Sequence, residues 1–257
     1  PFFGATYIPP VSQHGRPGFP DMLERIHEVW TTDRAQVLDA GERIGAYLNQ
    51  ITASAPQPLE VDQRAIEAGF DYFRRNFDSA NGGFGNAPKF PRPSVLNFLL
   101  RYYARTKKPQ ALEMSVETLR AMAHGGMYDH IGGGFHRYAT DERWHVPHFE
   151  KMLYDQAQLV ISYLEAFQIT GKDFFATVAH DICDYVLRDL SHPDGGFYSA
   201  EDAESASDAS LPHQKEEGAF YVWTSSEINS LLSALEANVF ARHFGIDESG
   251  NVVADRV

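Results

Sequence analysis

The motif Gly-Gly-Phe recurs three times in this chain and constrains its fold more than any other feature. It begins at Gly82, Gly133 and Gly195, at spacings of 51 and 62 residues. Apolar residues at helical spacing fill the intervals, and we predict helices over residues 94–106, 109–124, 148–170 and 173–190. A hairpin of such helices cannot bury its apolar face alone, so successive hairpins must stack into an open solenoid or a closed α/α toroid. We therefore predict a mainly α fold with all three glycine turns on one rim.

Chemically distinctive side chains concentrate around the second turn. Residues 128–158 hold four histidines and five carboxylates. Pro147 suits the first turn of a helix, so we predict a helix from this residue and place Glu150 near its start, where the helix macrodipole favours a negative charge. Glu150 would then be ionised and suited to act as a base, a nucleophile or an acceptor for hydroxyl groups. The alternative is a glutamate that only caps the helix, which is the commoner role.

Our first hypothesis is that this cluster acts on a sugar, since aromatic rings stack on sugar faces while carboxylates and histidines accept hydroxyls and move protons. The candidate catalytic residues are His145, His148, Glu150 and Asp155, with Asp129 and His130 behind them. The candidate substrate-binding residues are Phe84, Lys89, Phe135, Arg137, Tyr138, Trp144, Lys151, Tyr154, Glu201, Asp202, Tyr221 and Trp223.

His145 and His148 also form an H-x-x-H pair, which raises the question of a metal. Pro147 separates them between a loop and the predicted helix, unlike the paired histidines on one helix of the zinc proteases. A third strong ligand at a known spacing does not accompany them. We therefore expect neither a metal nor another cofactor.

The net charge and the cysteine content limit which binding partners and which cellular compartment we expect. The net charge of −13 over 257 residues repels phosphate backbones and anionic membranes, so we expect no nucleic acid and no membrane partner. An apolar run of 18 residues and a signal-peptide pattern are both missing from the sequence. The single cysteine, Cys183, lies among apolar residues of a predicted helix, which favours a core thiol. We expect a reducing, cytoplasmic setting.

The remaining segments divide the chain. Residues 1–10 read as a strand pair, and a helix begins near Pro20. A proline-marked linker covers residues 52–58, and we place a domain joint across residues 35–58.

Beyond the third turn, residues 205–216 are small and polar, which is typical of a surface loop or a lid. Residues 218–223 predict a strand. Thr224 and Glu227 form a capping box that opens another helix.

Several blocks resemble one family. YDHIGGGFHRYATDERWHVPHFEKMLYDQAQL closely resembles the signature of the spermatogenesis-associated protein 20 family, and FDSANGGFGNAPKFPRP, GGFYSAEDAES and EEGAFYVWT look like its other blocks. PFFGATYIPP followed by GRPGF resembles the end of that family's thioredoxin-like domain. The resemblance implies that the chain is a fragment: a small remnant of a thioredoxin-like α/β domain over residues 1–35, a helix and linker over 36–58, and an incomplete toroid over 59–257. The Cys-x-x-Cys segment of the family's thioredoxin-like domain is absent here.

The family's helical region is similar to the six-hairpin toroids of N-acylglucosamine 2-epimerases and related glycosidases, which implies a carbohydrate-type cavity. We expect the chain to bind or modify a small neutral sugar or polyol, in an epimerase- or isomerase-like or a glycosidase-like reaction. An epimerase would use a histidine pair as base and acid, whereas a hydrolase needs two carboxylates roughly 5–5.5 Å or 6.5–9.5 Å apart.

Two other hypotheses stand beside the sugar enzyme. One is a non-enzymatic module that binds a client for its own thioredoxin-like domain, in redox or protein quality control. Carboxylates that are all paired with arginine or lysine would favour this module. The other is a purely structural toroid, against which the clustered histidines argue.

Overall fold

The structure is a computed structural model that describes residues 8–12, 15–53, 63–206, 213–247 and 250–251. The chain divides into two compact units, residues 1–61 and 62–257. In the first unit, α1 (Phe19–Thr32) packs against α2 (Arg34–Ala53), and neither helix has a buried residue. The strand pair expected over residues 1–10 falls mostly outside the described residues.

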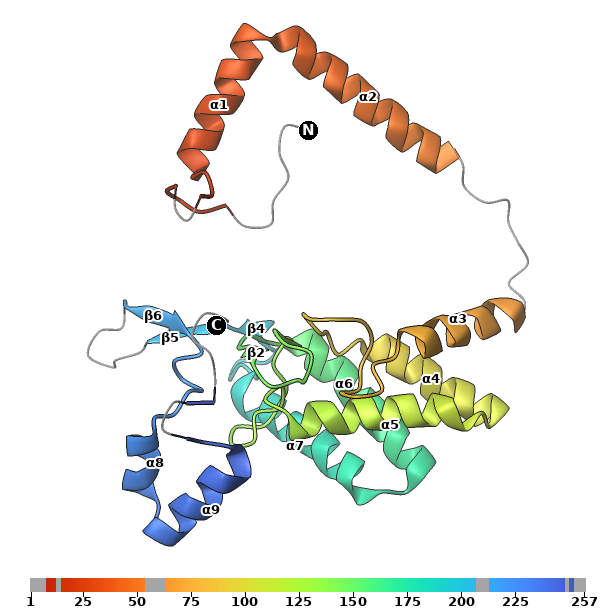
Figure 1. Cartoon of the computed structure of the whole chain (residues 1–257), viewed down its shortest axis with the longest axis vertical. Helices are drawn as coiled ribbons and strands as arrows, with labels where there is room; N and C mark the ends of the chain where they lie inside the picture. Colours follow the sequence, from red (N-terminus) through yellow and green to blue (C-terminus); the bar gives the residue numbers. More distant parts are fainter. Residues whose placement is uncertain (1–7, 13–14, 54–62, 207–212, 248–249, 252–257) are drawn as a thin grey trace. The chain divides into compact units, whose positions relative to one another are not determined.

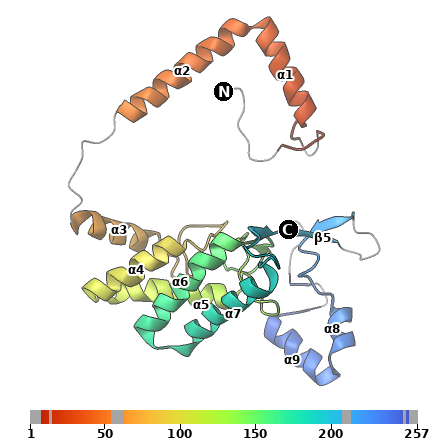
Figure 2. The same cartoon turned by 180° about the vertical axis from the view of Figure 1, so that it is seen from behind.

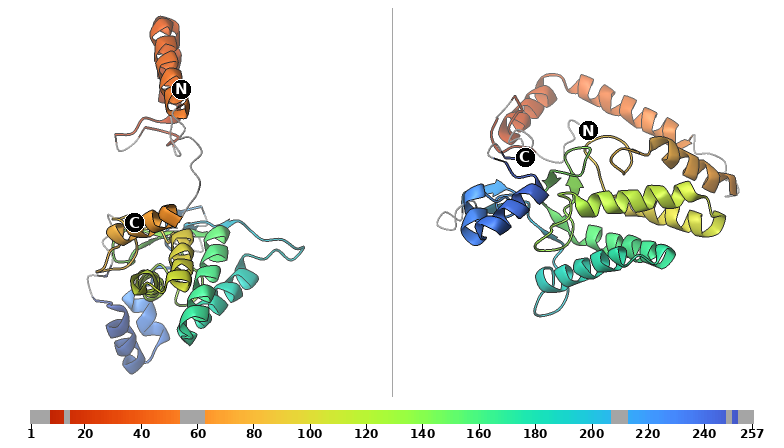
Figure 3. Two further views of the ribbon diagram at one scale, coloured as in Figure 1. Left: turned by 90° about the vertical axis from the view of Figure 1, so that its right-hand side faces the viewer. Right: turned by 60° about the horizontal axis from the view of Figure 1, so that its bottom comes forward.

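The second unit is built mainly from helices (Figure 1). Its helices are α3 (Gln63–Asn76), α4 (Pro93–Thr106), α5 (Pro109–His124), α6 (Leu153–Thr170), α7 (Asp173–Asp189), α8 (Ser225–Leu231) and α9 (Ala234–Phe244). The pairs α4–α5 and α6–α7 form hairpins, and α6 packs against both α4 and α7 (Figures 2 and 3). The predicted mainly α fold with stacked helical hairpins is confirmed. Among the described residues, a helix with the length and apolar character needed to span a membrane does not occur.

Local sequence explains where these helices begin and what they bury. Proline at the first position starts α4 and α5, where its missing N–H costs nothing. The core-facing residues of α4 are Leu96, Leu99 and Leu100, which follow helical spacing and are fully buried. The capping box predicted from Thr224 and Glu227 is confirmed at the start of α8, and a second one, at Ser233, opens α9.

The three glycine turns (residues 82–84, 133–135 and 195–197) share one backbone pattern. Each turn closes with an isolated β-bridge; the bridges join Phe77 with Phe84, Tyr128 with Phe135 and Ser191 with Phe197. The first two turns also share a hydrogen bond from an aspartate N–H to the second glycine carbonyl; these bonds are Asp78 to Gly83 at 2.9 Å and Asp129 to Gly134 at 3.0 Å. The sequence repeat is therefore a structural repeat.

Two buried lysines close the first two turns in the same way. Lys89 Nζ donates to Asp78 Oδ2 at 2.5 Å and to the Gly82 carbonyl at 2.8 Å. Lys151 Nζ donates to Asp129 Oδ2 and to the Gly133 carbonyl, at 2.8 and 2.9 Å. A buried charge is tolerated only when it is paired and hydrogen-bonded, and both lysines meet that condition. We call these two arrangements the lysine-closed turns.

Short strands link each turn region to the next. They are β1 (Tyr138–Ala139), β2 (Pro147–His148), β3 (Lys151–Met152), β4 (Ala200–Glu201), β5 (Glu204–Ala206) and β6 (Lys215–Glu217), paired antiparallel as β1–β2, β3–β4 and β5–β6. Lys89 bridges to Ala139, which joins the first turn region to the second, and the β3–β4 pair joins the second to the third. The prediction that the three turns lie on one rim is confirmed.

The helix predicted from Pro147 begins instead at Leu153, so this prediction was wrong. Residues 147–152 are extended because both of their edges are used: β2 pairs with β1, and β3 pairs with β4. Glu150 lies between these strands, and its carbonyl accepts from the Arg137 N–H at 2.8 Å. Glu150 therefore does not occupy the first turn of a helix, and the macrodipole argument for its charge does not apply.

Three smaller predictions also need correction. Cys183 is exposed on α7 rather than buried. Residues 218–223 contain a turn instead of a strand, since the Tyr221 N–H bonds to the Gly218 carbonyl. The loop expected over residues 205–216 has ordered flanks that pair as β5 and β6; residues 207–212 lie outside the described residues.

Candidate functional site

The β1–β2 hairpin presents a histidine and a tyrosine side by side. The register places Tyr138 opposite His148, and their rings stack with centroids 4.9 Å apart and planes 22° apart. Phe90 also lies next to Tyr138, at 4.8 Å between ring centroids. The hairpin thus fixes the plane of the His148 imidazole.

Arg137 and Glu150 form an ion pair next to this histidine. Arg137 Nη1 donates to Glu150 Oε2 at 2.7 Å, and His148 Nε2 lies 3.6 Å from the same oxygen. Burial opposes the charge of Arg137, but hydrogen bonds with Glu150 and Tyr154 outweigh it and raise the pKa of the guanidinium. Glu150 is therefore held between a fixed cation and an imidazole.

Asp155, in the first turn of α6, completes the group. Its side chain is almost fully buried, and Oδ2 has no hydrogen-bond partner among the described residues. Burial raises the pKa of this carboxyl to about 7; the Arg137 charge opposes the rise and the Glu150 charge adds to it. Arg137 Nε is the other buried atom that lacks a partner within the described part of the chain. Unpaired buried polar atoms are rare in proteins and call for a ligand, a water or a function.

We call Arg137, His148, Glu150 and Asp155 the His148 cluster. It unites three of the four leading catalytic candidates with one predicted binding residue. Tyr154, half exposed, lies beside it through its contact with Arg137.

Glu217 approaches the same histidine and was not among the predicted site residues. Its Oε1 lies 2.6 Å from His148 Nδ1 and 3.4 Å from the Phe149 N–H. The residue belongs to β6, on the far side of the segment outside the described residues. Its position directly before Gly218, in a block rich in acids and aromatics, was the available signal in the sequence.

A second polar group surrounds the lysine-closed second turn. The Lys151 ammonium lies 4.4 Å from the Tyr185 ring centroid and 5.1 Å from that of Tyr221. Glu201 Oε2 accepts from the Tyr185 and Tyr221 hydroxyls, at 2.5 and 3.5 Å. Asp129 is paired with Lys151; burial opposes its ionisation, but the Lys151 charge and several hydrogen bonds outweigh burial and lower its pKa. The partners of these residues are internal, which is the arrangement of a structural network.

Other candidates are separated from the His148 cluster. His145 is exposed, and its Nε2 lies 2.8 Å from the Asn251 carbonyl oxygen. His130 Nε2 lies 3.0 Å from the Gly125 carbonyl oxygen. Asp202 is exposed near Lys215, at 3.6 Å, and Trp223 is half exposed.

Besides Lys151, which closes the second turn, four predicted binding residues lie in the interior. Phe84, Phe135 and Trp144 belong to the hydrophobic core, and Lys89 closes the first turn. Trp144 Nε1 donates to the Asn81 carbonyl at 3.0 Å and so ties the second turn region to the first. Glycine-aromatic motifs signalled stacking on a sugar, but burial leaves these rings no free face.

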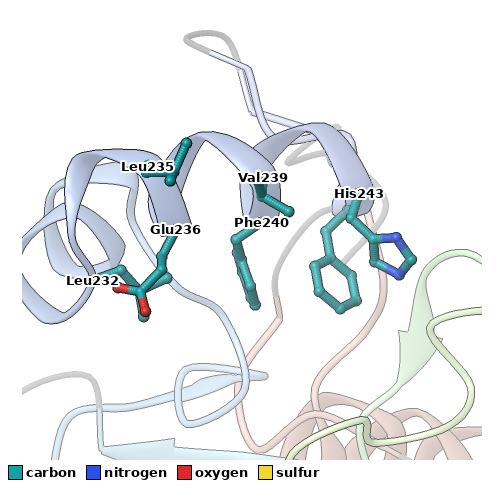
Figure 4. A pocket seen from close by; sticks show the side chains of 7 residues that line it. Leu232, Leu235, Glu236, Val239, Phe240 and His243 are labelled. Carbon is teal, nitrogen blue, oxygen red and sulfur yellow. The ribbon is translucent and has the colours of Figure 1, made fainter.

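Two cavities occur near α9. One, of about 440 Å³, is lined by Tyr128, His130, Phe174, Asp181 and Phe244, among others. The other, of about 480 Å³, runs along the apolar face of α9, where Leu235, Val239 and Phe240 line it (Figure 4). Neither is lined by the His148 cluster. Over the described residues, acidic, histidine and cysteine side chains do not form a group of three that could hold a metal ion.

The fold and the cluster define a class of protein. Its main unit consists of stacked helical hairpins and carries a histidine–carboxylate group on one rim. A helical unit comes before it in the sequence. The family model Thioredox_DsbH, described as a protein of unknown function (DUF255), matches residues 1–49. Spermatogenesis-associated protein 20 of Mus musculus is 42% identical over 273 residues, covering 98% of this chain and 34% of that protein. The Homo sapiens protein of the same name is also 42% identical, with the same coverage.

The resemblance to spermatogenesis-associated protein 20 is thereby confirmed over nearly the whole chain. The chain spans about a third of the length of these relatives. Among solved structures, a cellobiose 2-epimerase from Bacillus thermoamylovorans matches 54% of this chain and 40% of its own at 15% identity, with a TM-score of 0.49. A D-mannose isomerase matches 73% of this chain and 51% of its own at 12% identity, with a TM-score of 0.48. Likenesses at this level do not extend to function.

Proposed function

We propose that the His148 cluster is a proton-transfer site that acts on a small neutral sugar or polyol, in an epimerase- or isomerase-like reaction. The observation that carries this proposal is Asp155, a buried carboxyl with a pKa of about 7 whose Oδ2 has no partner among the described residues. A group that titrates near neutral pH can both give and take a proton.

The members of the cluster suit complementary roles. Pairs of titratable groups whose surroundings separate their pKa values are typical of acid–base sites. Asp155, neutral below about pH 7, supplies the acid, while His148 Nε2, beside the Glu150–Arg137 pair, supplies the base. In an open-chain sugar the base takes the proton from the carbon next to the carbonyl. The C–H electron pair forms a C=C bond to the carbonyl carbon while the carbonyl π pair moves onto the oxygen, which takes the proton of the acid to give an enediol. The protonated base then returns a proton to a carbon of the enediol as an enediol hydroxyl gives its proton back to the carboxylate, which regenerates both groups.

Arg137 supports this reaction over glycoside hydrolysis. Its Nε is buried and has no partner within the described part of the chain, so a donor is available for the oxygen on which negative charge develops. Glu150 already occupies Nη1 of the same guanidinium, which fixes the guanidinium in place. The net charge of −13 disfavours a phosphorylated substrate.

The test uses the full-length protein with a panel of unphosphorylated aldoses, ketoses and disaccharides in deuterated water. We expect turnover with deuterium incorporated next to the carbonyl, and a loss of at least about 100-fold in Asp155→Asn and Glu150→Gln. The matched control is Asp202→Asn, an exposed carboxylate outside the cluster. Hydrolysis products without deuterium would replace the isomerase proposal with a glycosidase. Parent-like turnover in both cluster variants would refute the site.

A second candidate function is a client-binding module attached to the thioredoxin-like part. The pairing of Asp78, Asp129 and Glu150 with lysine or arginine favours it, as does the position of both cavities away from the cluster. Asp155, whose Oδ2 lacks a partner among the residues that the structure describes, argues for the enzyme. If no sugar binds or turns over, capture of unfolded peptides by the full-length protein is the measurement that supports the module.

A further inference from the structure

The β5–β6 hairpin delivers Glu217 to His148 with little freedom. β6 ends at Glu217, and the next residue, Gly218, has a φ of +75° and donates to the Ala203 carbonyl at 2.9 Å. A Cβ at Gly218 would lie 2.5 Å from the Phe149 ring, so the backbone is pressed against the residue that follows His148. The approach of Glu217 is therefore built into the end of the hairpin.

The short contact determines where the imidazole proton lies. A carboxylate only accepts hydrogen bonds, so at 2.6 Å from Glu217 Oε1 the Nδ1 atom of a neutral His148 must carry the hydrogen. The other nitrogen, Nε2, then keeps its lone pair and faces Glu150 Oε2, at 3.6 Å. Stacking on Tyr138 holds the ring plane in this orientation.

We propose that Glu217 is a positioning residue that holds His148 in the Nδ1–H form and aims the Nε2 lone pair into the cluster. Its effect on turnover rests on the proposed function, whereas its effect on the tautomer does not. The hairpin of β5 and β6 thereby becomes part of the site through one carboxylate.

The contact is suited to orientation more than to stability. The side chains of His148 and Glu217 are 23% and 31% exposed, and ion pairs that water reaches contribute little to folding. Loss of Glu217 should thus leave the melting temperature nearly unchanged while changing the state of His148. A purely structural residue would show the opposite pattern.

The test is nitrogen–proton correlation NMR of the imidazole rings in the full chain, with the His148 signals assigned by their loss in His148→Gln. Above the imidazole titration the parent should show His148 protonated on Nδ1. Glu217→Ala should shift it toward the Nε2–H form. Glu217→Gln, whose amide oxygen still accepts, should retain the parent form. Glu216→Ala is the matched control, because Glu216 is the exposed neighbour on the same strand.

Two NMR results overturn the proposal: a parent His148 protonated on Nε2, or a tautomer that Glu217→Ala leaves unchanged. In the sugar assay, Glu217→Ala should lower kcat by about 10- to 100-fold at similar KM, below the roughly 10⁴-fold cost of a wrong tautomer in a serine protease. An Nδ1–H tautomer without any sugar turnover would refute the proposed function and leave the assignment of Glu217 intact. Turnover that is insensitive to Glu217→Ala would refute its positioning role.

Discussion

At the scale of single residues, the structure separates buried charges that are compensated from one that is not. Lys89 and Lys151 are fully buried, and each has an aspartate and a carbonyl oxygen as partners. Asp155 is nearly as buried but keeps one oxygen without a partner among the described residues. The first two stabilise their turns, whereas the third costs stability when it ionises. Such a cost is tolerated where a function requires it.

The loss of stability caused by ionising Asp155 depends on pH. Its pKa is about 7 in the folded chain against 3.8 for an unperturbed aspartate. Between these values the folded state keeps a proton that the unfolded state has released, so the contribution of this group to stability is fully present below about pH 3.8 and lost as the pH rises through 7.

Asp155→Asn copies the protonated form, and we expect it to raise the free energy of unfolding at pH 8 by at most about 4 kcal/mol. Near pH 4 its effect should be close to zero. Denaturation curves at the two pH values measure this difference. Asp202→Asn, at an exposed position, is the control. An equal effect of Asp155→Asn at both pH values would contradict the raised pKa.

At the scale of elements, the lysine-closed turns are the devices that hold the rim together. We expect Lys151→Met to cost about 3–5 kcal/mol, because it leaves Asp129 buried without its counter-charge. The double variant Lys151→Met/Asp129→Asn should recover most of that loss, since Asn still accepts from the neighbouring N–H groups. Urea denaturation of the single and double variants measures the coupling. Additive losses would show that the pair does not act as a unit.

The glycines of the turns differ in what covers them. Gly134 and Gly195 both have positive φ, at +75° and +96°. A Cβ on Gly134 would lie 2.5 Å from the Tyr185 ring, while one on Gly195 would meet no described atom within 4 Å. We expect Gly134→Ala to cost roughly 1–3 kcal/mol more than Gly195→Ala, because only the former adds overpacking to backbone strain. Equal losses of unfolding free energy in the two variants would mean that backbone strain alone accounts for the cost of both substitutions.

At the scale of the whole molecule, periodicity and repeats predicted the helical hairpins and the common rim. The leucines of α4 and the prolines that open α4 and α5 are local signals, and these helices matched the prediction closely. The helix predicted over residues 147–152 was wrong because the conformation of this segment depends on strand partners far along the chain, at Tyr138 and Glu201. For the same reason sequence spacing grouped His148, Glu150 and Asp155 but could not reveal Glu217, 69 residues away.

The division into two units predicts that residues 62–257 fold on their own. The hydrophobic core runs from Phe70 to Ile182, and α1 and α2 contribute no buried residue. We expect residues 62–257 alone to unfold cooperatively, within a few degrees of the melting temperature of the whole chain. Calorimetry of both proteins measures this. A large loss in the shorter chain would show that residues 1–61 support the core.

The links between the turns have a consequence for how the molecule opens. Lys89 binds forward to Ala139, Trp144 binds back to Asn81, and Lys151 pairs forward with Glu201. These links join neighbouring repeats, which is the coupling of a one-dimensional stack whose outer members fray first. Amide hydrogens should therefore exchange slowest in α5 and α6, which have a helical neighbour on either side, and fastest in α8 and α9.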